Sequence, residues 1–156
     1  MSWSMDPADE RAFIDQLAML FERSGIPPVA GRILGRCLVC DPPHQSSQQL
    51  ADYLNASAGA VSTATRMLVA VGLLERIRLR GSRAMWFQIR NDAWETMWSR
   101  EAENIRVIHG IAARGRELVA TAPPETRVRM EQFDDLYSFL VDAMPKMWAQ
   151  WKERQR

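Results

Sequence analysis

The hydrophobic positions of the chain follow a helical spacing and then a strand-like spacing within one stretch, residues 46–90. Two amphipathic segments come first, 46–54 and 57–71, and each opens with a serine, a preferred N-cap residue. The first serine is followed three residues later by a glutamine, which makes a capping box. Asn55 and Ala56 lie between the two segments and predict a turn. Two short helices joined by a tight turn are the pattern of a helix-turn-helix.

The second of these segments has one apolar side and one small, polar side. The predicted buried side consists of Val61, Ala64, Thr65, Leu68 and Val71. The predicted outer side consists of Gly59, Ser62, Thr63, Arg66 and Ala70. A small polar face with a single arginine fits inside the DNA major groove, where it can touch base edges and phosphates. We therefore predict that this segment is a DNA recognition helix.

After Gly72, which is expected to end the second helix, the chain changes to an alternating pattern that is typical of strands. The apolar positions of the alternation are Ile77, Leu79, Met85, Phe87 and Ile89. They predict a two-stranded ribbon with one apolar face and a tip at residues 80–83, Arg-Gly-Ser-Arg. Two guanidinium groups on a flexible loop suit a contact with the DNA backbone or the minor groove, which is the role of a wing.

Together these elements predict a winged helix-turn-helix with a defined set of DNA-contacting residues. The candidates are Ser47, Gln48, Ser57, Gly59, Ser62, Thr63, Arg66, Arg78, Arg80, Ser82 and Arg83. Charge supports this choice, since residues 31–90 hold eight arginines against three acidic residues while both flanks are slightly acidic. Winged helices also serve as protein-interaction modules, in which case the arginines form a solvated hairpin face.

The run AGAVSTATRMLVAVGLLERIRLRGSRAMWF, residues 58–87, resembles the DNA-binding segment of the MarR superfamily, in particular of its GbsR-like branch. Residues 25–35, GIPPVAGRILG, match a pattern that this branch tends to show before the motif. The resemblance covers residues 13–90 well, and the last third of the chain only by its helical architecture. It implies a homodimer built by the terminal helices, and a small apolar, aromatic or cationic effector held between the winged motif and those helices.

Two helices are expected before the winged motif. Asp6 and Pro7 form an N-cap followed by proline, and the apolar stripe that follows is Phe13, Leu17, Leu20 and Phe21. Gly25 is expected to end this helix, and a proline pair opens a second one that reaches about Cys40. Gly31 and Gly35 lie four residues apart, so they predict a face where another backbone approaches closely. The predicted core side of the second helix is Ile33, Leu34, Cys37 and Leu38.

Two long amphipathic helices are expected after the wing, one from Asp92 to about Ala120 and one from about Glu125, with a kink predicted at Pro145. The first would be about 40 Å long, so its apolar face exceeds what a small motif can cover. A second copy of the chain is the expected partner, and a monomer that folds the helices back on itself is the alternative. The predicted dimerisation residues are Phe133, Leu136, Leu140, Met144, Trp148 and Trp151. A two-fold dimer would place its recognition helices about 34 Å apart on a near-palindromic operator.

The fold class is therefore predicted as mainly α with a small β-wing, a winged helix-turn-helix with long N- and C-terminal dimerisation helices. One domain is expected over residues 1–156, with the DNA-binding part at 28–91 and the dimerisation part at 6–25 and 92–154. The aromatic residues Trp94, Trp98, Phe21 and Tyr137 are candidates for the effector site that the resemblance implies. Aromatic stripes at helical spacing also fill cores.

Cys37 and Cys40 have the C-x-x-C spacing of a redox or metal site, with His44 four residues further on. Both cysteines end an apolar helix, so we interpret them as core residues, with a thiol sensor and a metal site as alternatives. No catalytic constellation stands out, since the chain has two histidines and no glycine-rich phosphate loop. No enzyme activity, metal or cofactor is therefore predicted.

No apolar run approaches the roughly 18 residues needed to cross a bilayer, and the N-terminus lacks a signal-peptide layout, so a cytoplasmic protein without a membrane partner is expected. The principal hypothesis is a homodimeric transcriptional repressor that binds operator DNA and is released by a small effector. The alternatives are a winged-helix protein-interaction module and a thiol-based redox sensor.

Overall fold

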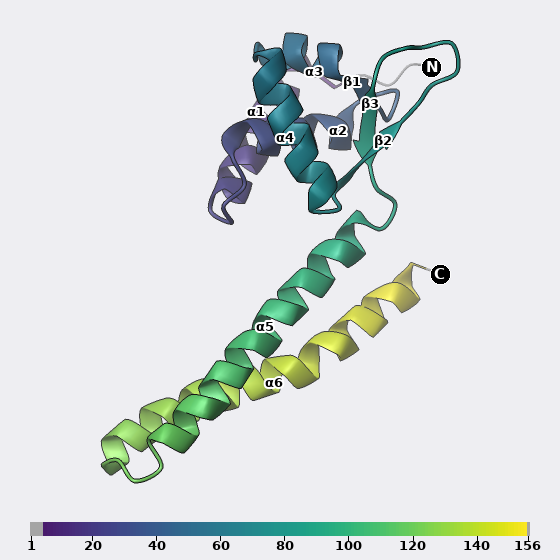
Figure 1. The fold of residues 1–156 in the computed structure, drawn as a ribbon. Coiled ribbons are helices and arrows are strands. Elements are labelled where there is room, and N and C mark those ends of the chain that lie inside the picture. The colour runs from purple at the N-terminus through teal and green to yellow at the C-terminus, as the bar shows by residue number, and fades with distance from the viewer. Residues whose placement is uncertain (1–4, 156) are drawn as a thin grey trace. The chain divides into compact units, whose positions relative to one another are not determined.

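A computed structural model describes residues 5–155 of the chain. The described part contains six helices and three short strands (Figure 1). The chain divides into two compact units, Met1–Thr96 and Met97–Arg156, which we call the winged unit and the hairpin unit. The sequence predicted one domain whose DNA-binding part ends at residue 91, whereas this division falls between residues 96 and 97.

The winged unit opens with two packed helices, α1 (Pro7–Glu22) and α2 (Pro28–Val39). As predicted, the Asp6 carboxylate caps α1, where it accepts from the amide of Ala8 at 2.8 Å. The predicted close backbone approach is also confirmed. A Cβ atom on Gly31 would lie 2.8 Å from the Cα of Ala18, and one on Gly35 would lie 3.3 Å from the Cα of Ile14. The two glycines therefore let α1 lie directly against α2.

This close packing determines which side of α1 is buried. The α1 residues that face α2 are Ile14 and Ala18, at 2% and 4% exposure, whereas Phe13 and Leu20 of the apolar stripe are exposed. Ile14 and Ala18 are the buried residues because Gly31 and Gly35 of α2 allow the backbone of α1 to approach at these two positions. Leu38, predicted in the core of α2, is likewise exposed.

The helix-turn-helix consists of α3 (Ser47–Leu54) and α4 (Ala58–Ala70), and its predicted caps are confirmed. Ser46 accepts from the amide of Gln49 at 3.1 Å, and the Gln49 side chain accepts from the amide of Ser46 at 2.9 Å. Asn55 makes the turn with a φ of 49° in the left-handed region, which asparagine tolerates better than most residues. Ser57 accepts from the amide of Ala60 at 3.1 Å and so caps α4.

The core of the winged unit lies where α2, α3, α4 and the sheet meet. The side chains with 0% exposure at this centre are Ile33, Leu34, Leu50, Leu68 and Leu74. The predicted buried positions Val61, Ala64 and Thr65 of α4 are confirmed, while Val71 is only half-buried because it is the C-cap of the helix. Gly72 follows with a φ of 79°, so it ends α4 as predicted.

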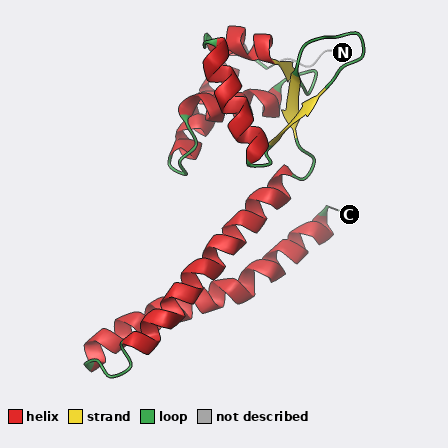
Figure 2. Ribbon diagram, in the orientation of Figure 1, coloured by secondary structure: helices red, strands yellow, loops and turns green. Residues whose placement is uncertain are grey.

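The sheet has three antiparallel strands in the order β1-β3-β2 (Figure 2). The predicted two-stranded ribbon is confirmed as the β2–β3 pair, and the third strand, β1, was not predicted. The strands are β1 (Gln45–Ser46), β2 (Leu74–Ile77) and β3 (Trp86–Ile89). Strand β1 is only two residues long, and both residues are polar, so it is too short to show an alternating pattern in the sequence. It pairs with β3 just before α3 begins and so joins the helix-turn-helix to the wing.

The hairpin also has a register that the alternation did not predict. Ile77 pairs with Trp86, and Arg76 pairs with Phe87. Directly opposed residues of an antiparallel pair share one face, so Arg76 lies on the face of Phe87 and Ile77 lies on the other. The predicted assignment was wrong because β2 ends at Ile77 and an eight-residue loop, residues 78–85, replaces a tight tip. A shift of one residue in register exchanges the two faces.

The hairpin unit holds most of α5 (Ala93–Leu118), which begins in the winged unit, and all of α6 (Pro124–Arg154). The carbonyl of Asp92 accepts from the amide of Thr96, while the Asp92 carboxylate pairs with Arg90 at 2.7 Å. The helix thus begins as predicted, although this side chain bonds outside it. α6 continues through Pro145. Among the described helices, none combines the length and apolar character needed to cross a membrane.

Candidate nucleic-acid interface

An open groove with a volume of about 290 Å³ lies between α3, α4 and the sheet of the winged unit. Its lining residues are Ser47, Gln48, Ala51, Ala58, Ser62, Thr65, Arg66, Arg76, Met85 and Phe87. Four of them, Ser47, Gln48, Ser62 and Arg66, are predicted DNA-contacting residues. The structure therefore brings together candidates from both helices of the helix-turn-helix.

The start of α3 is held in place by the base of the wing. The amide of Ser47 donates to the carbonyl oxygen of Met85 at 3.2 Å, which extends the pairing of β1 with β3 by one residue. Gln48, the next residue, is exposed, and its side-chain amide donates to Asp52 at 2.8 Å. The polar start of α3 is thus fixed relative to the sheet.

The outer face of α4 is exposed along its length, at Ser57, Gly59, Ser62, Thr63 and Arg66. The Nε of Arg66 donates to the carbonyl oxygen of Ser62 at 3.3 Å, so the side chain lies back along the helix toward its N-terminal half. A Cβ on Gly59 would meet no atom closer than the Ser57 hydroxyl at 4.0 Å. This face is therefore small, polar and open.

Arg76 lines the same groove and was missed as a candidate. Sequence reasoning placed it on the outward side of the wing and chose Arg78 and Arg80, which lie closer to the expected tip. The register puts Arg76 opposite Phe87, so its exposed guanidinium belongs to the groove that Arg66 also lines. The surplus of arginines in residues 31–90 includes Arg76, but the strand pairing is needed to show that Arg76 lines the groove.

The wing loop, residues 78–85, exposes the three predicted arginines Arg78, Arg80 and Arg83. Gly81 turns the loop with a φ of 82°. Ser82, also a predicted DNA contact, is only half-exposed because its hydroxyl accepts hydrogen bonds within the loop.

The aromatic candidates for an effector site lie in different settings. Trp94 is 39% exposed in the winged unit, where Phe21 is half-buried on α1. In the hairpin unit Trp98 stacks on Trp148 with ring centroids 5.6 Å apart, while Tyr137 contacts Phe133 at 5.0 Å. Tyr137 precedes Trp148 by eleven residues of α6, about 16 Å along the helix. Trp98 and Tyr137 therefore do not share one aromatic cluster.

The predicted dimerisation residues differ in how far their own chain covers them. Phe133, Leu136 and Trp151 are exposed at 39%, 53% and 40%. Leu140 and Trp148 are half-buried, and Met144 is buried within its own hairpin unit at 6%. The exposed members of the set are the ones available to a partner.

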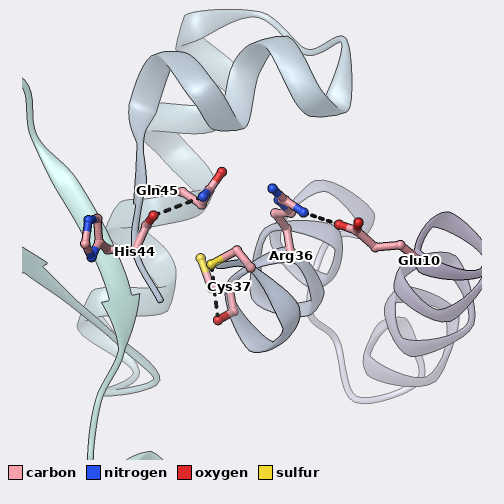
Figure 3. A network of polar contacts seen from close by, with 6 residues as sticks. Glu10, Arg36, Cys37, His44 and Gln45 are labelled. Carbon is pink, nitrogen blue, oxygen red and sulfur yellow. Dashed lines mark hydrogen bonds and ion pairs between the residues drawn. The ribbon is translucent and has the colours of Figure 1, made fainter. Parts of the chain in front are cut away.

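The two cysteines are free and buried in the winged unit. Figure 3 shows Cys37 close to the ion pair of Glu10 with Arg36. Burial, and then the neighbouring Cys40 thiol, raises the pKa of Cys37 to about 12, and burial also raises the pKa of Cys40. Thiols that stay protonated are poor nucleophiles and poor metal ligands, which supports a packing role.

The thiol of Cys40 donates to the carbonyl oxygen of Cys37 at 3.7 Å, and Gln45 donates to the carbonyl oxygen of His44 at 3.0 Å (Figure 3). In the part of the chain that the structure describes, no cluster of three or more His, Cys, Asp or Glu side chains could hold a metal ion. Both polar contacts are local, one at the end of α2 and one at the start of β1.

Comparison with known proteins agrees with this architecture. Residues 92–154 match the sequence profile of a family described as MmpR5-like MarR family transcriptional regulator. The chain is 34% identical over 149 residues to the HTH-type transcriptional regulator MmpR5 of Mycobacterium tuberculosis. The aligned region covers 94% of this chain and 88% of that protein. A crystal structure described as that of a transcriptional regulator superposes with a TM-score of 0.66 at 33% identity, over 93% of this chain and 99% of that one. This chain therefore belongs to the MarR family of winged-helix transcriptional regulators.

Proposed function

We propose that the protein is a homodimeric repressor that binds a near-palindromic DNA operator and is released by a small apolar, aromatic or cationic effector. The groove of the winged unit is the main support for the proposed DNA-binding surface, because Ser47, Gln48, Ser62 and Arg66 line it together with Arg76. Membership of the MarR family makes the protein a transcriptional regulator and not an enzyme. Its assignment to the GbsR-like branch and its cytoplasmic location stay predictions.

The proposed DNA contacts follow from the side chains that each surface offers. Arg66 carries a planar fork of donors on a face of small residues, so it suits a guanine edge or a phosphate in the major groove. Arg80 and Arg83 sit on an exposed loop, where contact with phosphates or the minor groove is the better fit. Arg76, at the base of the wing, suits a phosphate between these two regions. Ser57, Gly59, Thr63 and Arg78 complete the proposed surface.

The proposed dimer follows from the exposed apolar side chains of the long helices. In α6 these include Phe133, Leu136 and Phe139, the last of them 67% exposed. Apolar side chains repeated along a helix rarely stay in water, and a second copy presents the same surface to cover them. Dimerisation would present two recognition helices to successive major grooves of one operator.

The proposed effector response needs a ligand that favours one of two dimer states. A ligand that binds the DNA-free state better by about 3 kcal/mol would lower operator affinity more than a hundredfold. The aromatic side chains of Trp94 and Trp98 are proposed to take part, because flat faces hold both apolar rings and quaternary ammonium ions. The two other functions considered, a protein-interaction module and a thiol sensor, gain no support, since the family consists of transcriptional regulators and the thiols are buried.

The deciding experiment is selection of bound sequences from random double-stranded DNA, followed by affinity measurements on the enriched site. Arg66→Ala is expected to weaken binding to that site by about 5- to 150-fold, the equivalent of a lost base contact. Arg114→Ala is the matched control, since Arg114 is exposed in the hairpin unit and pairs only with an exposed Glu117 among the described residues. Enrichment of no sequence, or equal affinities of Arg66→Ala and the control, would remove this surface from the proposal. A reporter gene placed behind the site then tests whether the protein represses.

A further inference from the structure

We propose that Trp86 is a positioning residue that holds the wing loop in its DNA-binding conformation through Ser82. The indole Nε1–H of Trp86 donates to the hydroxyl oxygen of Ser82 at 3.0 Å. The proposal rests on the proposed DNA-binding role of the wing, and it assigns a specific task to two residues of that wing. Ser82 was predicted to touch DNA directly, whereas its position shows that it first organises the loop.

Ser82 is the residue to which the rest of the wing loop is tied. Its amide donates to the carbonyl oxygen of Leu79 at 3.1 Å, which closes the turn that contains Gly81. Its hydroxyl oxygen accepts from the amide of Ala84 at 3.1 Å as well as from the indole of Trp86. A serine hydroxyl has two lone pairs, so both are occupied and its own proton stays available for an outside acceptor such as a phosphate oxygen.

Trp86 is suited to this task because the strands hold it on both sides. It begins β3, the central strand, where it pairs with Ser46 of β1 and with Ile77 of β2. The ring of His44 meets the indole edge-on, with centroids 5.2 Å apart and an interplanar angle of 82°. Neighbouring residues in a strand point to opposite faces, so Trp86 lies away from the buried Phe87. The donor is thus fixed to the sheet, and the acceptor belongs to the loop.

The consequence concerns the two arginines that flank the tip. Arg80 and Arg83 lie within two residues of Ser82, so a fixed Ser82 fixes their backbone while their side chains stay exposed. A loop of eight residues that had to become ordered on DNA would lose binding free energy to conformational entropy. The hydrogen bond from Trp86 reduces that loss because the loop is already ordered before DNA arrives.

The first test uses the free protein and needs no DNA. Trypsin cleaves after arginine, so cleavage after Arg80 and Arg83 reports how often the loop opens. Trp86→Phe keeps a ring beside His44 but removes the donor, and Ser82→Ala removes the acceptor. Trp86→Phe is expected to speed cleavage in the loop by about 2- to 12-fold, the effect of one neutral hydrogen bond, and Ser82→Ala by at least as much because it also removes the bond from the Ala84 amide. The double variant should be no faster than Ser82→Ala, because that substitution already removes the bond from Trp86.

Controls separate the hydrogen bond from general destabilisation. Ser82→Thr keeps the hydroxyl and should restore slow cleavage, and Ser99→Ala removes an exposed serine of α5 and should change nothing. Thermal unfolding should be unchanged in Ser82→Ala. If Trp86→Phe fails to fold, hydrogen exchange of the Trp86 indole proton in Ser82→Ala and Ser82→Thr decides, because the Ser82 hydroxyl also accepts from the Ala84 amide. Slow hydrogen exchange of the Trp86 indole proton in the wild type, lost in Ser82→Ala, is the expected spectroscopic signature. Loop cleavage at the wild-type rate in Ser82→Ala would overturn the proposal.

The second test measures the effect on DNA. Trp86→Phe is expected to lower affinity for the selected site by about 2- to 12-fold, and this effect should vanish when Arg80 and Arg83 are both alanine. An equal loss in that background would show that Trp86 acts outside the wing and would overturn the positioning role. If the wild type binds no DNA while cleavage still depends on Ser82, the proposed function fails and the loop anchor stands. The two failures are thus distinguishable.

Discussion

The winged unit and the hairpin unit solve the burial of apolar side chains in different ways. In the winged unit, Ile33, Leu34 and Leu68 are fully buried within one chain. In the hairpin unit the buried apolar side chains are Ile105, Ala112 and Met144. The exposed large apolar residues of this unit are Val107, Ile111, Leu118, Val128, Phe133, Leu136, Phe139, Met147 and Trp151. The winged unit has a core of large, fully buried side chains, whereas the hairpin unit buries few apolar side chains and exposes many.

The contacts between α5 and α6 show the same difference. They include a stack of Trp98, Trp148 and Trp151 and a buried aspartate, Asp134, whose carboxylate lies 3.0 Å from Arg116. The second carboxylate oxygen of Asp134 lies 3.6 Å from the Nε2 of His109, beyond a good hydrogen bond. Stacked rings and charged contacts thus line the side of the two helices where they meet, while few of their apolar side chains are buried. The comparison teaches that the winged unit encloses a core of fully buried side chains, whereas the hairpin unit leaves most of its large apolar side chains exposed within the single chain.

The largest expected effect comes from a charge placed on the uncovered face of the hairpin unit. Phe139 is 67% exposed in the single chain, so Phe139→Glu should cost one folded chain little. In a dimer the same carboxylate would be buried without a partner, and the dimer dissociation constant should rise by at least about 100-fold. Sedimentation measures the dimer, and circular dichroism checks that helix content is kept.

The matched control is Gln132→Glu, which adds the same charge at an exposed polar position of α6. It should leave the dimer intact. A wild-type chain that is monomeric at micromolar concentration and still binds its operator would contradict the comparison itself.

Truncation of a core residue in each unit gives the next largest effect. Leu34→Ala should lower the free energy of unfolding by about 2–5 kcal/mol, because it leaves a cavity where the side chain had 0% exposure. This decrement should be the same at every chain concentration. Leu136→Ala, at a side chain 53% exposed, should act chiefly by weakening the dimer, so its effect should fade as the chain concentration rises. Chemical denaturation at several concentrations separates the two, and identical behaviour of both variants would remove the distinction.

Adding a methyl group to a glycine should distinguish the units again, with a smaller effect. Gly31→Ala places a Cβ 2.8 Å from the Cα of Ala18, a backbone atom that cannot move without α1, and should cost about 1–3 kcal/mol. Gly110 of α5 has no atom within 4 Å of such a Cβ. Gly110→Ala should therefore stabilise its helix by about 0.5–1 kcal/mol. Thermal unfolding measures both, and a neutral Gly31→Ala would show that α1 is loosely held.

The winged unit should also show a dependence of stability on alkaline pH, which becomes appreciable only above pH 9. The pKa of Cys37 is raised from 9.0 to about 12 in the folded chain, so above pH 9 the unfolded chain loses a proton that the folded chain keeps. Stability is therefore fully present below pH 9 and falls as the pH rises, by about 1.4 kcal/mol at pH 10. Cys37→Ala should lack this part of the decline. Parallel stability curves of the two proteins between pH 8 and pH 10 would show that the thiol is not buried as described.

The sequence predicted the features of the fold that depend on residues close together in the chain, such as helix caps and helix faces. The serine caps of α3 and α4 and the glycine face of α2 needed only residues within one turn of each other. The pairing of β1 with β3 joins residues about forty positions apart, and two polar residues carry no periodic signal for it. The register of the wing, and with it the place of Arg76, depends on where a loop closes, which alternation alone does not determine.

In the candidate site, too, the features set by nearby residues could be predicted from the sequence, and those that depend on loop shape or strand pairing could not. Ser62 and Arg66 could be assigned to one face from helical periodicity, and they line the groove as that face required. Ser82 could be recognised as a residue of the tip, but its bond to Trp86 depends on the shape of the loop. The side of α1 that packs on α2 carries Ile14 and Ala18 and not the apolar stripe with Phe13 and Leu20, because the glycines of α2 determine where the two helices approach.

Ser46 shows how this regulator could change its operator without losing its fold. One residue pairs with Trp86 in the sheet and caps α3 through both its hydroxyl and its amide. Gln48 and Ser62, which line the groove, are exposed and leave most of their donors and acceptors to outside molecules. A substitution at Ser46 should therefore disturb the fold as one in the core would, while substitutions at the side chains proposed to meet DNA should change the operator and leave the scaffold intact.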